Sequence, residues 1–167
     1  SITVPVTYDE VSLEITVEGR ADGIFPEKDG SGMTIDEIKG IYRHVSRLKE
    51  PVLVHKAQAM CYGYIYAKEN KLKDIGIRMT YCHIPTEEIR LFEERISFRQ
   101  IENWFLDLVQ EYAKWAAWEI KWQEERNATI REITFPFEYR EGQKNLVKGV
   151  YQSILRRKRL TSKHLPA

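Results

Sequence analysis

Two short segments near the amino terminus constrain the fold of this chain most strongly. The first, residues 19–25, carries Asp22, and the second, residues 33–41, carries Glu37 and Lys39. Both read as β-strands, and the polar, glycine-containing residues between them predict a hairpin loop. Because side chains alternate along a strand, Glu37 and Lys39 must project from one face and Ile38 from the other.

This hairpin would bring two carboxylates and one ammonium group to a single place. Paired strands lie roughly 4.8 Å apart, so an in-register Asp22 would share a face with Glu37 and reach the same metal ion. Carboxylate oxygens suit Mg²⁺ or Mn²⁺, and such an ion can activate a water molecule as a nucleophile. Lys39 would help to orient and deprotonate that water, or would stabilise negative charge at phosphorus. The pattern predicts phosphodiester hydrolysis, although charges on a solvated strand face produce the same alternation.

A helix is predicted directly after Pro51, over residues 52–70, because apolar and aromatic residues recur there at helical spacing. Gln58 and Tyr62 are four residues apart and therefore lie on one face of this helix. Taken alone, such a pair is also typical of partly buried polar residues on an amphipathic helix.

In this order the three segments resemble the PD-(D/E)XK nuclease superfamily and, within it, the RecB-like exonuclease branch. That branch combines an Asp strand, an acidic-x-Lys strand and a following helix with Gln-x-x-x-Tyr. The matching stretch covers roughly residues 8–66. The catalytic residues that the resemblance implies are Asp22, Glu37, Lys39, Gln58 and Tyr62.

The same resemblance implies which residues bind the metal ion and what the other site residues do. Asp22, Glu37 and the backbone carbonyl of Ile38 would bind Mg²⁺ or Mn²⁺, and Lys39 would assist the attacking water. The helix pair would flank the site and position the substrate backbone. The implied fold is α/β, with a central mixed sheet flanked by helices, as in restriction endonucleases.

The chain departs from this family at its beginning. Members of the branch usually start with a helix that carries a further Glu or His ligand, whereas residues 1–8 alternate as a strand. We therefore expect a fold without the usual first helix, in a fragment of a longer protein whose metal site is incomplete and whose activity is in doubt. Glu10, Glu14 and Glu18 are alternatives for a third carboxylate, each also explained as a solvated strand or turn residue.

Cysteine usage separates this chain from relatives that hold an iron–sulfur cluster on four cysteines. Only Cys61, within the predicted helix, and Cys82, in a later strand, are present, so no cluster is expected. Free cysteines and the lack of a signal peptide predict a cytoplasmic protein. No apolar stretch approaches the length of a membrane span, so no membrane partner is expected.

Charge bears on the expected partner, which is DNA. The formal net charge is only +1, but phosphate contacts supply much of the affinity for nucleic acid, so the contact groove itself should be basic. Each candidate cation is also explained as a solvent-exposed charge. The candidates are Arg20, Lys39, Arg43, His44, Arg47, Lys49 and Lys56.

The remainder of the nuclease-like core, residues 1–126, continues in an α/β manner. Strands are predicted over residues 75–84 and 89–98, and one long helix over residues 99–126. Three of its tryptophans, Trp115, Trp118 and Trp122, favour packing over base stacking. A boundary is expected at residues 127–133.

Residues 127–167 differ in kind. Residues 135–143 are similar to the aromatic-Arg-x-Gly-Gln stretch before the phosphate-binding loop of DinG-type superfamily-2 helicases, in which Gln143 would match an adenine contact. An amphipathic helix is predicted over residues 144–159. No Gly-x-x-x-x-Gly-Lys loop follows, so ATP cannot be hydrolysed here by that mechanism. A helicase motor in the same polypeptide is the expected partner.

These observations predict a divalent-metal-dependent DNA nuclease, exonucleolytic in action, within a DNA repair or helicase–nuclease protein. The alternative is a non-catalytic module that keeps the fold and binds nucleic acid or docks on a helicase motor.

Overall fold

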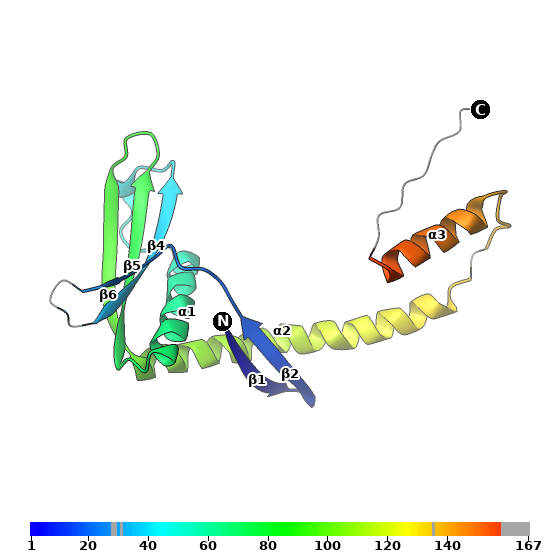
Figure 1. Ribbon diagram of the computed structural model, residues 1–167, viewed down its shortest axis with the longest axis horizontal. Helices are drawn as coiled ribbons and strands as arrows, with labels where there is room; N and C mark the ends of the chain where they lie inside the picture. The colour runs from blue at the N-terminus through cyan, green and yellow to red at the C-terminus, as the bar shows by residue number, and fades with distance from the viewer. Residues whose placement is uncertain (28–29, 31, 135, 158–167) are drawn as a thin grey trace. The chain divides into compact units, whose positions relative to one another are not determined.

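In the described part of the chain, a run of strands is followed by helical segments, a second pair of strands and two further helices. The computed structural model describes residues 1–27, 30, 32–134 and 136–157. The chain divides into two compact units, Ser1–Trp122 and Gln123–Ala167, and one helix runs through the division. Figure 1 shows the elements, which are β1 (Ile2–Tyr8), β2 (Val11–Val17), β3 (Gly23–Pro26), β4 (Met33–Ile41), the short helix η1 (Val45–Arg47), α1 (Leu53–Glu69), β5 (Asp74–His83), β6 (Ile89–Ser97), α2 (Phe98–Glu132) and α3 (Gln143–Leu155).

A four-stranded mixed sheet in the order β3-β4-β5-β6 organises the first unit. β3 pairs with β4 and β5 with β6 in antiparallel fashion, whereas β4 and β5 run parallel. A parallel pair needs a crossover connection, and α1 supplies it between β4 and β5. The predicted α/β class with a central mixed sheet is confirmed, and this architecture is compatible with a restriction-endonuclease-like fold.

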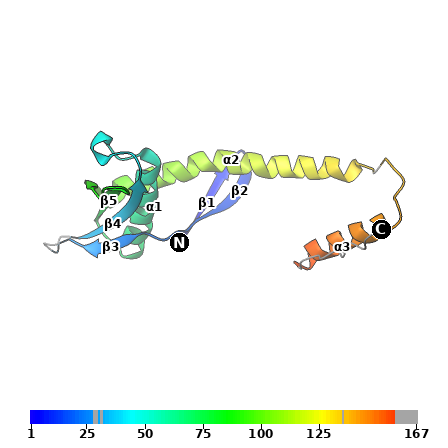
Figure 2. The same ribbon diagram turned by 90° about the horizontal axis from the view of Figure 1, so that it is seen from above.

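The core lies between one face of the sheet, α1 and the first turns of α2 (Figures 1 and 2). Ile77 and Tyr81 alternate along β5 toward this core and are almost fully buried. Tyr64 of α1 stacks on Phe105 of α2, with ring centroids 4.3 Å apart. Gly63 permits the close approach of α1, because a Cβ atom there would lie 2.6 Å from Cδ1 of Ile77.

A separate two-stranded antiparallel sheet is formed by β1 and β2. Apolar side chains on one of its faces pack against the core. Lys121 of α2 forms an ion pair with Asp9 in the hairpin turn, and Gln110 donates to the carbonyl of Thr7 at 3.5 Å. The strand predicted over residues 1–8 is therefore present, and its partner β2 is an addition to the predicted elements.

The strand predicted over residues 19–25 is shorter than expected. β3 begins at Gly23, and Asp22 lies immediately before it. The preceding residues leave the sheet where the chain passes Tyr62. Gly19 lies so close that a Cβ atom there would be 2.5 Å from the Tyr62 ring.

The second long helix is longer than predicted. α2 continues to Glu132 because residues 127–132 contain neither glycine nor proline, and the next helix-breaking residue is Pro136. Most of the expected boundary at residues 127–133 is therefore helical.

α3 begins at Gln143, after Gly142 in a left-handed conformation with φ of 80°, and ends at Leu155. The predicted helix over residues 144–159 was too long at its carboxyl end, since Arg157 also has a positive φ, 50°. Residues 158 and 159 of that prediction lie outside the described residues, as does Phe135 of the helicase-like stretch. None of the helices formed by the described residues combines the length and the hydrophobicity that crossing a bilayer requires.

Candidate active site

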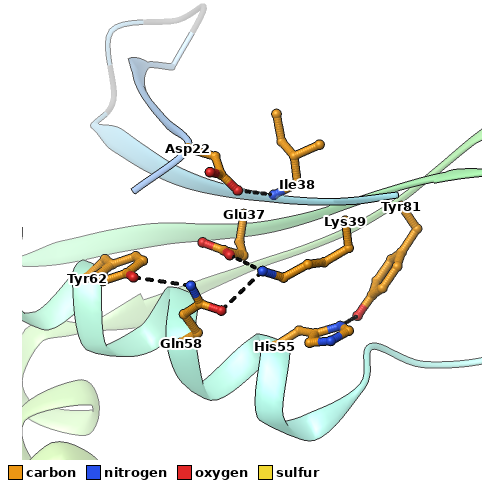
Figure 3. A network of polar contacts seen from close by, with 8 residues as sticks. All are labelled: Asp22, Glu37, Ile38, Lys39, His55, Gln58, Tyr62 and Tyr81. Carbon is orange, nitrogen blue, oxygen red and sulfur yellow. Dashed lines mark hydrogen bonds and ion pairs between the residues drawn. The ribbon is translucent and has the colours of Figure 1, made fainter. Parts of the chain in front are cut away.

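Four of the five predicted catalytic side chains form one hydrogen-bonded network between β4 and α1 (Figure 3). Nζ of Lys39 donates to Oε1 of Glu37 at 2.5 Å and to Oε1 of Gln58 at 3.1 Å. Nε2 of Gln58 donates to the hydroxyl of Tyr62 at 3.1 Å. The spacing i, i+2 on the strand and i, i+4 on the helix brings each pair to the facing surfaces of the two elements.

Glu37 occupies the most buried position in this network. Only 1% of the residue is exposed, because it projects from β4 toward the packed face of α1. Its Oε1 is paired with Lys39, while Oε2 is buried and has no hydrogen-bond partner among the residues that the structure describes. An unpartnered buried carboxylate oxygen is costly, since burial removes the water that would solvate it. A cation at Oε2 would remove that cost.

Lys39 is a stable ammonium group in this environment. Its hydrogen bond to Glu37 raises its pKa, an effect only partly opposed by desolvation, and the negative charges of Glu37 and Asp22 raise it further. About a quarter of the side chain remains exposed, 26%. Lys39 can therefore donate hydrogen bonds and supply positive charge at neutral pH, but it has no free lone pair to act as a base.

Asp22 joins the site through the main chain of β4. Its Oδ2 accepts a hydrogen bond from the backbone N–H of Ile38 at 2.9 Å, between the two residues that point toward α1 (Figure 3). The β3–β4 pairing ends at Gly23 opposite Asp36, which leaves the next position of the strand edge to this side chain. Among the described residues, no hydrogen bond or ion pair joins the Asp22 carboxylate directly to Glu37 or Lys39.

The backbone carbonyl of Ile38 lies at the same edge. The N–H and C=O of one strand residue point to the same side, and the Ile38 N–H points toward Asp22. The oxygen atoms of Glu37 and of this carbonyl thus come from β4, and those of Asp22 come from the residue directly before β3. Oxygen donors fit Mg²⁺ or Mn²⁺.

The expected third carboxylate does not join them. Glu10 lies in the β1–β2 turn, Glu14 is exposed on β2 and Glu18 is exposed beyond it. Within the described part of the chain, no three His, Cys, Asp or Glu side chains gather around a common point. Two carboxylates, those of Asp22 and Glu37, remain beside the Ile38 carbonyl, and magnesium usually takes one or two carboxylates from a protein.

Asp36, the other acidic residue of β4, has a structural role on the opposite face. Its carboxylate accepts from Nη2 of Arg78 at 2.8 Å and from Oγ1 of Thr80 at 2.7 Å. Arg78 also lies over the ring of Phe25 at 4.1 Å. Adjacent acids on one strand therefore serve different faces, as the alternation predicts.

Two further residues, His55 and Tyr81, form a separate contact beside the network and were missed in the sequence. Nδ1 of His55 lies 3.2 Å from the hydroxyl of Tyr81, which also accepts the backbone N–H of Val52 at 3.0 Å. Tyr81 stands beside Lys39 in the parallel register, and His55 precedes Gln58 by three residues on the same helix face (Figure 3). The spacing 55-58-62 on one helix was the signal that could have found His55.

Several other residues of the chain do not take part in this network. His83 is a satisfied sheet residue, within hydrogen-bonding distance of Thr86 and of the carbonyl of Tyr42. Cys61 and Cys82 are free, and burial raises the pKa of the Cys61 thiol. Gln143 lies in the second unit, where its Oε1 accepts the backbone N–H of Arg140 at 2.7 Å.

Comparisons with known proteins give no family for the chain. No family model and no curated protein matches it. A solved structure described as "Crystal structure of SSO0001" is similar over 65% of this chain and 46% of its own length, with 19% sequence identity and a TM-score of 0.33. The chain thus spans less than half of that protein.

Proposed function

We propose that this chain is the nuclease module of a DNA repair or helicase–nuclease protein. It acts as a metal-dependent deoxyribonuclease of the PD-(D/E)XK type, exonucleolytic and RecB-like, in the cytoplasm. The observation that carries the proposal is the environment of Glu37: a buried carboxylate with one unpartnered oxygen, beside an ammonium group and within one residue of the Asp22–Ile38 contact.

Asp22, Glu37 and the Ile38 carbonyl would hold the Mg²⁺ or Mn²⁺ ion. When bound, the ion supplies Lewis-acid activation of water and charge neutralisation at a phosphodiester. The unpartnered Oε2 of Glu37 supports this ligand set, because a cation there satisfies an otherwise costly buried atom.

The chain's own residues provide orientation and charge. Lys39 donates hydrogen bonds to the attacking water or to a phosphoryl oxygen, where its positive charge offsets the negative charge that develops. Gln58 holds the Lys39 ammonium in place through Oε1, and Tyr62 fixes the orientation of the Gln58 amide. Both act by limiting the positions that Lys39 can adopt.

The alternative, a non-catalytic module that binds nucleic acid or docks on a helicase motor, is favoured by one observation. Lys39 already pairs with Oε1 of Glu37, so the charge of that carboxylate is balanced within the protein. For docking, Trp115, Trp118 and Trp122 of α2 offer half-exposed aromatic surface, between 43% and 56% exposed.

A cleavage assay tests the proposal. End-labelled single- and double-stranded DNA is incubated with the protein and with Mg²⁺, Mn²⁺ or EDTA. We expect metal-dependent release of short products from the ends. Lys39→Ala should lower the rate by roughly 10²-fold or more, as expected for loss of a charge-stabilising donor, and Gln58→Ala by less.

Asp107→Asn on α2 is the control variant, since Asp107 is an exposed acid outside the network. It should cleave like the parent chain. DNA binding without cleavage under every metal condition would refute the enzyme and favour the binding module. If the protein neither binds nor cleaves DNA, the docking role remains.

A further inference from the structure

The connection from β4 to α1 carries an unusual set of charges. Residues 42–51 contain Arg43, Arg47 and Lys49 against a single acid, Glu50. All three cations are exposed, and none has an ion-pair or hydrogen-bond partner among the described side chains. Many other cations of the chain are paired with carboxylates, namely Lys39, Lys56, Lys68, Arg78, Arg95, Lys114 and Lys121.

This connection is held in one shape. Val45 and Leu48 point into the core, with 2% and 8% exposure, so the cations between and beside them must face solvent. The helical turn η1 is closed by hydrogen bonds from Arg47 N to His44 O and from Leu48 N to Val45 O, both 3.1 Å. Binding of a ligand to these cations therefore costs little backbone conformational entropy.

The connection also adjoins the candidate active site. It starts three residues after Lys39, directly after β4, and ends four residues before His55 of α1. The Tyr81 hydroxyl accepts the N–H of Val52, the residue after the connection, and lies within hydrogen-bonding distance of His55. In Figure 3 the side chains of Tyr62, Gln58 and His55 follow one another along α1 in the direction of this connection.

We infer that Arg43, Arg47 and Lys49 form a phosphate-binding surface that guides a nucleic-acid strand toward Lys39. The inference rests on the proposed function, because a polymer cleaved at Lys39 must carry further phosphates past the ends of β4 and α1. Three unpaired cations beside one another favour a polyanion with regular negative charges, and each phosphate contact releases counterions. Bases are not read here, so sequence-independent binding is expected.

The test is the salt dependence of binding in EDTA, where cleavage cannot occur. A fluorescent single-stranded oligodeoxynucleotide is titrated with the full chain, and anisotropy is recorded from low to moderate salt. The variant combines Arg43→Gln, Arg47→Gln and Lys49→Gln. The slope of log K against log salt should become shallower by about 2, since each lost contact in a single strand removes about 0.7.

The matched control removes three cations from the opposite end of the sheet. Lys71 and Lys73 precede β5 and Arg99 follows β6, roughly 30 Å from the β4–α1 connection given the ten residues of β5. They too are exposed and unpaired among the described residues. Changing them to glutamine should leave the slope as in the parent chain. Arg43→Lys with Arg47→Lys should also retain it, because charge is conserved.

An unchanged slope in the connection variant, with melting as in the parent chain, would overturn the inference. So would an equal loss in the control, which would mean that total charge alone matters, or tighter binding of polyglutamate than of DNA, which would indicate an acidic protein partner. The two proposals are tested by different measurements: DNA cleavage with Lys39→Ala tests the nuclease, and the salt slope with the connection variant tests the surface. If the parent chain never cleaves DNA but loses its salt slope with the connection cations, the surface stands and the nuclease does not.

Discussion

Glu37 is a carboxylate that the fold buries and pairs on only one of its two oxygens. Removing a charged group from water costs several kcal/mol even after local relaxation, and one ion pair offsets only part of that. Lys39 provides the ion pair and is itself held in place by Gln58. A residue whose position costs stability in the metal-free chain is a candidate for function, because binding recovers the cost.

Replacing Glu37 tests this coupling in the metal-free protein. Because the hydrogen bond to Glu37 is the largest cause of the raised Lys39 pKa, Glu37→Gln should bring that pKa down toward the ordinary lysine value of 10.5. NMR titration of the Lys39 side chain measures it directly. An unchanged Lys39 titration in the variant would mean that the pair is absent in solution.

The same pair predicts the pH dependence of folding. The pKa of Lys39 is higher in the folded than in the unfolded chain, so its contribution is fully present below about pH 10.5 and is lost as pH rises through the folded value. The stability of the parent chain relative to Glu37→Gln should therefore be constant near neutrality and fall above pH 10.5. Denaturant unfolding at several pH values measures this, and a difference that shrank between pH 6 and 8 would contradict it.

At the scale of elements, the site depends on how closely α1 approaches the sheet. A Cβ atom on Gly63 would lie 2.6 Å from Cδ1 of Ile77 and 3.2 Å from Cδ1 of Ile101. Both isoleucines are buried, so neither side chain can move away without disturbing its neighbours. The missing side chain of Gly63, about one and a half turns along α1 from Gln58, therefore helps to set the distance at which Gln58 reaches Lys39.

Gly63→Ala should lower the free energy of unfolding by roughly 1–3 kcal/mol, because overpacking outweighs the better helix propensity of alanine. The matched test combines it with Ile77→Val, which removes the clashing methyl group and alone costs about 1 kcal/mol. The double variant should be more stable than the sum of the two single effects. Strict additivity in denaturant unfolding would show that the close approach does not depend on this contact.

The sequence predicted the site elements well because each depends on local spacing. Alternation placed Glu37 and Lys39 on one strand face, and helical spacing placed Gln58 with Tyr62. Asp22 was predicted less well, since its position depends on where β3 ends, and the passage of Gly19 beside Tyr62 decides that. The hairpin partner β2 and the His55–Tyr81 contact depend on tertiary packing that no local pattern contains.

At the scale of the whole molecule, the candidate site belongs entirely to the unit Ser1–Trp122. The buried residues of α2 end at Ala117, and α3 has none. None of the described residues of the second unit is buried.

A chain that ends at Trp122 should keep the fold of the site. We expect cooperative thermal unfolding with a Tm within about 5 °C of the full chain, because the loss of exposed helix changes the free energy of unfolding by little. Calorimetry and the chemical shifts of β4 and α1 provide the measurement. Non-cooperative unfolding of the shortened chain would show that the second unit supports the first.

Whether Glu37 binds a metal ion is measured by titration with Mn²⁺, with the free ion followed by electron paramagnetic resonance. We expect the full chain to remove one ion per molecule from solution. Glu37→Gln and Asp22→Asn should abolish this binding, and Asp107→Asn should retain it. Binding that survives Glu37→Gln unchanged, or no binding by the parent chain at millimolar Mn²⁺, would contradict it.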